Sequence, residues 1–126
     1  MLTPFIAPNA APAIGPYSHG VVASGTFVFL SGQIALHADG SMVEDDITLQ
    51  TAQVLSNIKT LLASQNMTLN NVVKSTVFLR TMDDFAAMNA VYAEAFGDHR
   101  PARSAIAVAG LPKNARVEIE VVACTA

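Results

Sequence analysis

The chain has 126 residues, of which 52% are hydrophobic and only 13% are charged, and its formal net charge is −3. This length predicts one domain, residues 1–126, that can bury a core without disulfides or metal. The acidic balance and the lack of a basic cluster argue against nucleic acid as the main partner, because phosphate binding needs many lysines and arginines. The low charge of so small a chain favours self-association over a monomer.

The cysteine count and the N-terminal segment argue against disulfide-stapled, metal-binding, secreted and membrane-spanning proteins. Cys124 is the only cysteine, so no internal disulfide can form, and no Cys/His pair has the spacing of metal ligands. Residues 1–20 carry four prolines and no basic lead, unlike a signal peptide, and no apolar run has the length of a membrane span. No GxGxxG or Walker-type loop is present. We expect a cytoplasmic protein without membrane contact, metal or cofactor.

The hydrophobic periodicity predicts six strands and two helices. In chain order these are strands at 3–7, 17–24 and 26–34, a helix at 45–66, a strand at 72–80, a helix at 83–97, and strands at 102–109 and 115–125. Gly25 is the expected turn of a hairpin between the second and third strands. Asp45 or Asp46 is expected to cap the first helix, and Gly97 to end the second.

This order of elements favours an α+β fold over a doubly wound α/β fold, because strands and helices do not alternate strictly. Two helices can cover only one face of a mixed sheet of about six strands. The opposite face must then meet water or a partner. Its expected mixture of Ala, Phe, Ser, Arg and Glu is too apolar for plain solvent exposure and suits a subunit interface with polar pockets.

Strand alternation predicts which side chains share each face, because successive side chains along a strand point to opposite sides. Branched aliphatic side chains are expected beneath the helices, so Ser104, Ile106 and Val108 should point inwards. Arg103 and Glu118 are then expected together on the second face. The other side chains expected on that face are Phe27, Phe29, Ser31, Gln33, Ala105, Ala107, Arg116 and Glu120.

Arg103 and Glu118 are the strongest candidates for chemistry. Their strands are joined by the short segment 110–114, which predicts that the two residues are neighbours or nearly so. One interpretation is an exposed cross-strand ion pair of little energetic value. The other is a site in which Arg103 grips a carboxylate with its bidentate fork while Glu118 handles a proton or a water.

Four further residues are candidates for a functional site, and each of them also has a purely structural interpretation. Asn89 lines a site, or it only hydrogen-bonds locally at the edge of an apolar helix stripe. Ser31 and Gly32 end a buried strand, where the glycine allows close approach of another group or forms a bulge. Tyr17 lies in a loop, where its ring either packs against the fold or covers a binding site as a lid. The helix stripe beside Asn89 is expected to fill the core and consists of Phe85, Met88, Tyr92 and Phe96.

Five segments follow one another as they do in one protein family: AIGPYSHG, FLSGQI, NIKTLLASQNMTLNNVVKSTVFL, DFAAMNAVYAEAF and PARSAIAVAGLPKNARVEIEVVA. Together they resemble the Rid/YjgF family, also called the L-PSP endoribonuclease family, and most nearly its RidA branch of enamine/imine deaminases. The resemblance extends from about Ile14 to Ala123. The motifs GPYS, SGQ, PARS and VEIE are specific in combination, whereas any one alone would be weak.

The resemblance implies a chorismate-mutase-like α+β fold and a homotrimer with a pocket at each subunit junction. It implies hydrolysis of 2-aminoacrylate-type enamines and imines, which are small carboxylate-bearing substrates, to 2-keto acids and ammonia. Arg103 would hold the substrate carboxylate, and Glu118 would position or activate the attacking water. The residues that would line the pocket are Tyr17, Ser31, Gly32, Asn89 and Ala105.

The chain also departs from the family pattern. Many RidA-like members carry a cysteine where this chain has Ala105, so a thiol takes no part here. The segment 97–101 is shorter than in the best-known members and is expected to alter one pocket wall. His19 and Arg100 have no assigned role, and Arg100 is near enough to Arg103 in sequence to compete with it for an anion. Two alternative functions stay open, namely endoribonuclease or translation inhibitor, a label that the family also carries, and a non-catalytic metabolite-binding trimer.

Overall fold

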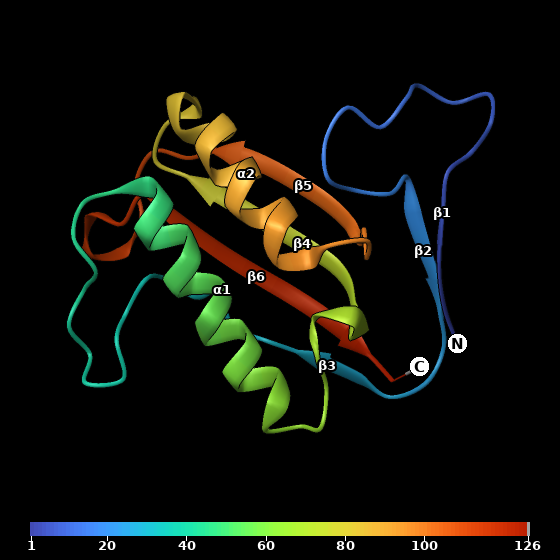
Figure 1. The fold of residues 1–126 in the computed structure, drawn as a ribbon, viewed down its shortest axis with the longest axis horizontal. Coiled ribbons are helices and arrows are strands. Elements are labelled where there is room, and N and C mark those ends of the chain that lie inside the picture. The colour runs from blue at the N-terminus through green and yellow to red at the C-terminus, as the bar shows by residue number, and fades with distance from the viewer. Residues whose placement is uncertain (126) are drawn as a thin grey trace.

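A computed structural model of the chain describes residues 1–125 and contains six strands and two α-helices (Figure 1). The elements are β1 (Leu2–Phe5), β2 (Gly20–Ala23), β3 (Phe27–Phe29), α1 (Ile47–Ala63), β4 (Val72–Leu79), α2 (Phe85–Phe96), β5 (Ala102–Ala107) and β6 (Val117–Cys124). Short 3₁₀ turns precede β4, α2 and β6. Every predicted helix and strand is present, and the second and third strands are shorter than predicted.

A four-stranded mixed sheet forms the body of the fold, with the strand order β3-β6-β4-β5. β6 pairs antiparallel with β3 and β4, whereas β4 and β5 run parallel and are connected through α2. β1 and β2 form a separate antiparallel pair, and a bridge between Ser18 and Ala102 joins this part of the chain to β5. The predicted α+β class is confirmed, with the six strands divided into a sheet of four and a pair.

Both helices lie on the same face of the sheet, as Figure 1 shows. α1 begins where the side chain of Asp46 accepts a hydrogen bond from the backbone N–H of Leu49, which confirms the predicted cap. α2 ends at Gly97, whose φ of 61° favours glycine. Within residues 1–125, neither helix has the length and apolarity to cross a membrane. The core beneath the helices includes Val54, Ile58, Leu62, Val77, Met88 and Ile119.

The hairpin predicted around Gly25 is wrong. β2 pairs with β1 in the register Leu2–Ala23, and β3 pairs with β6 in the register Val28–Ala123. Gly25, with a φ of 136°, leads the chain from the strand pair into the sheet. The eight-residue β6 needs a partner along this edge, and Val28 packs against the core from there. The long-range partner therefore prevails over the local turn.

The open face of the sheet lies opposite the helices and mixes large apolar side chains with polar and charged ones. The alternating pattern of β3 and β6 is as predicted, with Val28, Ile119 and Val121 directed to the core. Phe29 is 74% exposed and Ile106 is 47% exposed, so large apolar side chains stay uncovered in a single chain. The side chains on this face include Phe27, Phe29, Lys74, Thr76, Phe78, Ser104, Ile106, Glu118 and Glu120.

The predicted orientation of β5 is wrong. Its parallel register with β4 places Arg103 beside the buried Ser75 on the helix-covered face, which Ala105 shares. Ile106 lies beside Phe78 on the open face. The rule that branched aliphatic side chains point inwards fails here for two reasons. The open face itself carries large apolar side chains such as Phe78, beside which Ile106 can lie, and α2 offers polar and aromatic partners to Arg103.

Candidate functional site

One face of α2 holds the guanidinium of Arg103. Phe85, Asn89 and Tyr92 are spaced by four and three residues, which places them on the same side of the helix. The Nη1 of Arg103 donates a hydrogen bond of 2.6 Å to the Oδ1 of Asn89. The Cζ of Arg103 lies 4.9 Å from the ring centre of Tyr92 and 5.8 Å from that of Phe85. Tyr17 adds a third ring at 5.8 Å, within the range of cation–π attraction.

Arg103 keeps most of its hydrogen-bonding capacity free. A guanidinium has five N–H donors, yet among residues 1–125 only Asn89 accepts from Arg103, and no carboxylate pairs with it. The side chain is half-buried, and this burial lowers its pKa, an effect that Tyr92 and Tyr17 oppose. A half-buried cation without a counterion can bind an anion, and its planar fork suits a carboxylate.

Gly15 lies beside the Nη2 of Arg103, the nitrogen that does not donate to Asn89. A Cβ placed on Gly15 would be 3.4 Å from the Nη2 of Arg103 and 3.4 Å from the ring of Tyr17. The absence of a side chain at this position therefore leaves space beside Nη2. We call Gly15, Tyr17, Phe85, Asn89, Tyr92 and Arg103 the arginine group.

A second set of polar residues lies at the open face. The segment after β3 pairs with β6 on either side of Ser31 and Gly32, with one extra residue between the two pairing points, so it forms a bulge. The carboxylate of Glu118 occupies the space that a Cβ on Gly32 would fill. Both structural expectations for Gly32, a bulge and a close approach, are met. We call Ser31, Gly32 and Glu118 the glutamate group.

Arg103 and Glu118 lie on opposite faces of the sheet, which contradicts the prediction that they are neighbours. β4 lies between their strands, because β5 reaches one edge of β4 through α2 and β6 takes the other edge. In the register of the sheet, Arg103 aligns with Ser75 of β4 and Glu118 aligns with Phe78. Positions three residues apart on a strand point to opposite faces. The predicted site residues therefore form two separate groups in one chain.

The sequence prediction missed Gly15, Ser75, Phe85 and Tyr92 as neighbours of Arg103. Phe85 and Tyr92 are expected from the sequence to fill the core, and Tyr92 is indeed fully buried. The signal that could identify them is the spacing of Phe85, Asn89 and Tyr92. A polar Asn89 between two aromatic residues on one helix face needs a polar partner, and Arg103 is that partner. Ala105 lies two residues further along β5 and packs against the core.

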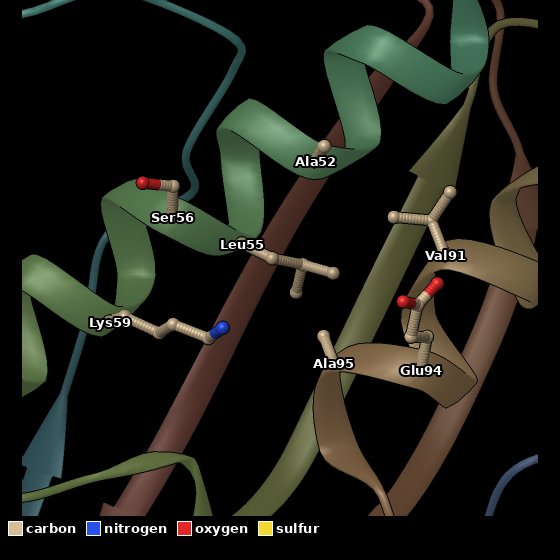
Figure 2. Close-up of a pocket in the computed structure, with 7 residues that line it drawn as sticks. All are labelled: Ala52, Leu55, Ser56, Lys59, Val91, Glu94 and Ala95. Atoms are coloured by element: carbon tan, nitrogen blue, oxygen red, sulfur yellow. The ribbon is translucent and has the colours of Figure 1, made fainter.

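Neither group lies in the groove between the two helices. This groove has a volume of about 420 Å³ and is lined by Ala52, Leu55, Ser56, Lys59, Val91, Glu94 and Ala95. Figure 2 shows the side chains of α1 and α2 on its two sides, with Lys59 and Glu94 as the charged members. Within residues 1–125, no three His, Cys, Asp or Glu side chains are placed to hold a metal ion.

These observations define an α+β protein with a half-buried arginine without a carboxylate partner under one helix and a glutamate on the open face of the sheet. Comparison with known proteins identifies the family. The family model described as Endoribonuclease L-PSP matches residues 8–125. A RutC family protein of Pyrococcus horikoshii is 50% identical over 116 residues, which cover 91% of each chain. The chain belongs to the endoribonuclease L-PSP family, which is the Rid/YjgF family.

Two further relatives bear on activity and fold. The 2-iminobutanoate/2-iminopropanoate deaminase of Salmonella typhimurium is 41% identical over 118 residues, which cover 91% of each chain. A crystal structure of a Rid family protein from Yersinia pestis, described as of unknown function, has a TM-score of 0.89 at 30% identity and covers 98% of each chain. The fold is thus that of the Rid family, and the family includes proteins named as imine deaminases.

Proposed function

We propose that this protein hydrolyses reactive enamines and imines of the 2-aminoacrylate type to 2-keto acids and ammonia. The observation that carries the proposal is Arg103, a half-buried guanidinium whose only acceptor among residues 1–125 is Asn89. Such a cation suits the carboxylate that these small substrates carry. The name of the Salmonella relative supports the same class of reaction.

The reaction needs a held carboxylate, a placed water and a route for protons. The enamine first tautomerises to the imine, whose carbon is electrophilic. Water adds to this carbon and forms the new C–O bond, and the nitrogen takes up protons. The C–N bond then breaks, ammonia leaves and the carbon becomes a ketone, so one water is consumed for each ammonia released. Glu118 would accept the proton of the attacking water, while Arg103 holds the carboxylate in place.

A complete site in this proposal requires two copies of the chain, because Arg103 and Glu118 point away from each other in one copy. The arginine group of one subunit would meet the glutamate group of the next in a homotrimer. The exposed Phe29 and Ile106 support this, since the open face supplies the apolar centre that an interface needs. A head-to-tail contact of this kind closes into a ring when it repeats around a threefold axis.

RNA cleavage, which the description of the family names, has less support. Arg80 and Arg116 are held by Asp45 and Asp84 at 2.9 to 3.2 Å, and the net charge is −3. Binding to a phosphate backbone depends on clustered cations that are free to contact it. The remaining basic residues are few, and only Arg100 and Arg103 are close together in the sequence. They are Lys59, Lys74, Arg100, Arg103 and Lys113.

A coupled assay tests the proposed reaction. A pyridoxal-phosphate dehydratase that releases 2-aminoacrylate or 2-iminobutyrate supplies the substrate, and release of the keto acid is followed over time. We expect the purified protein to accelerate this release above the spontaneous rate. Binding of a keto acid without acceleration would indicate a non-catalytic metabolite-binding trimer instead. Cleavage of RNA by the pure protein, lost on mutation of Arg103 or Glu118, would favour the ribonuclease.

Gly15→Ala is expected to raise the KM of the imine substrate by about tenfold, because the new methyl group would obstruct one charged hydrogen bond at the Nη2 of Arg103. The kcat should change little, since Glu118 and the attacking water are untouched. Gly110→Ala is the matched control, because a Cβ on Gly110 would meet nothing within 4 Å. Steady-state kinetics of both variants provide the measurement. An unchanged KM in Gly15→Ala would mean that the carboxylate does not approach from this side.

A further inference from the structure

We infer that Tyr92, anchored by Ser75, is a positioning residue that fixes the plane in which Arg103 presents its donors to the substrate carboxylate. The inference rests on the proposed function, in which Arg103 is the carboxylate ligand. Tyr92 and Ser75 are both 0% exposed, so neither side chain reaches a substrate. The contact of the Tyr92 ring with the guanidinium of Arg103 is the route by which it can act on binding.

Three elements meet at this point. The register of β4 and β5 places Ser75 beside Arg103 on the helix-covered face. Tyr92 reaches them from α2, with its hydroxyl 2.7 Å from that of Ser75 and its ring centre 4.9 Å from the Cζ of Arg103. Burial raises the pKa of the Tyr92 hydroxyl to about 12. The two hydroxyls therefore keep a neutral hydrogen bond throughout the physiological pH range.

The ring of Tyr92 is fixed from two sides. The hydrogen bond to Ser75 holds its hydroxyl end. Phe96, one turn further along α2, stacks on the ring with a centre-to-centre distance of 4.4 Å and an interplanar angle of 28°. A close-packed ring held in this way can act as a rigid platform, because core side chains held by packing and by hydrogen bonds have few alternative positions.

A platform matters because Asn89 alone cannot orient the guanidinium. The hydrogen bond to Asn89 fixes Nη1 but allows the group to turn about that contact. Bidentate binding requires two N–H groups to lie in the plane of the carboxylate. The face of Tyr92 restricts this turning, so Arg103 is ready to make two parallel hydrogen bonds. Without the platform, only the more distant rings of Phe85 and Tyr17 would restrain the guanidinium plane, and fewer bidentate contacts would form.

The inference predicts a selective loss of carboxylate binding. Tyr92→Leu removes the aromatic face and should raise the Kd of 2-oxobutyrate by about tenfold. The Kd of 2-oxobutanamide, which has no carboxylate, should not change. In the deaminase assay the loss should appear in KM, with kcat little altered. Tyr92→Phe keeps the face but releases the hydroxyl anchor, so its effect on the Kd of 2-oxobutyrate should be smaller, about threefold.

Isothermal titration calorimetry of both ligands, with the full-length wild type and each variant, provides the test. Ser75→Ala should match Tyr92→Phe, and the double variant should be no worse than either, because both changes remove the same hydrogen bond. Phe96→Leu removes the stacked ring and should have an effect on the acid of the same kind as Tyr92→Phe. Val54→Ala is the control, since it removes buried side-chain volume from α1 and leaves α2, Ser75 and Arg103 unchanged. Two results would overturn the inference. One is a Tyr92→Leu variant that shifts the Kd values of the acid and the amide equally, and the other is a Val54→Ala variant that changes the ratio of these Kd values as much as Tyr92→Leu does.

Failure of this inference and failure of the proposed function give different results. If the wild type accelerates imine hydrolysis but Tyr92→Leu binds the acid and the amide as the wild type does, the positioning role is wrong and the function stands. If the wild type binds 2-oxobutyrate without accelerating hydrolysis, the function is wrong, and the ratios of Kd values still decide the positioning role. A wild type that binds neither ligand would overturn both.

Discussion

Arg103→Ala is expected to lower kcat/KM for imine hydrolysis by about 10²- to 10³-fold, the cost of truncating one partner of a desolvated, charge-assisted pair. Most of this loss should appear in KM. The carboxylate carries the same charge in the substrate and in the transition state, so Arg103 stabilises both. The variant also leaves Asn89 without its partner, so a thermal unfolding curve is needed beside the kinetics to show that the fold is intact.

Two matched variants show whether the loss of activity comes from the planar guanidinium of Arg103 or only from the loss of one positive charge. Arg103→Lys restores the charge without the planar fork and should recover only part of the lost activity. Arg100→Ala removes the same charge three positions earlier in the chain and should behave as the wild type. If Arg100→Ala lowered kcat/KM as much as Arg103→Ala does, the result would indicate that Arg100 takes part in binding the substrate carboxylate. If Arg103→Ala had the kinetic constants of the wild type, the proposed mechanism would be wrong.

The helices and the long strands are predictable because their patterns repeat over many residues. α1 follows a 3.6-residue periodicity with Asp46 as its cap, and β6 alternates over eight residues. The partner of a short strand is less predictable. β3 has three residues, so its pairing is decided by the edge of β6, which is about ninety residues away in sequence. The local signal of Gly25 contains no information about that edge.

The site was predictable only in part. Alternation shows that Arg103 and Ala105 share a face of β5, but it cannot show which face, and the size of Ile106 points to the wrong one. The face that Arg103 takes depends on α2, because Asn89 accepts its hydrogen bond and the ring of Tyr92 packs against its guanidinium. The family resemblance places Arg103 and Glu118 in one site, whereas one chain holds them apart. The proposed site shared between two copies would account for this difference, and the alternation within a strand contains no information about a second copy.

The separation of the two groups leads to a second large expected effect, recovery of activity by mixing two inactive variants. Arg103→Ala lacks the carboxylate ligand, and Glu118→Gln keeps the shape of the side chain but cannot accept a proton, so its kcat should fall by about 10²-fold or more. If each site combines Arg103 of one subunit with Glu118 of the next, an equal mixture with random reassortment should contain about a quarter of its sites intact. A site within one copy would give no recovery.

Reassortment itself needs a control, because assemblies that never exchange subunits would also show no recovery. Wild type mixed equally with the double variant Arg103→Ala/Glu118→Gln provides it. Random exchange should leave about a quarter of the sites active when each site spans two subunits, but about half when it lies within one. Assemblies without exchange also leave half of the sites active, so mass spectrometry of the intact assemblies must first show that they contain both kinds of subunit. With exchange shown, no recovery from the two single variants would contradict the shared site, because opposite faces of one sheet can meet only through a second copy.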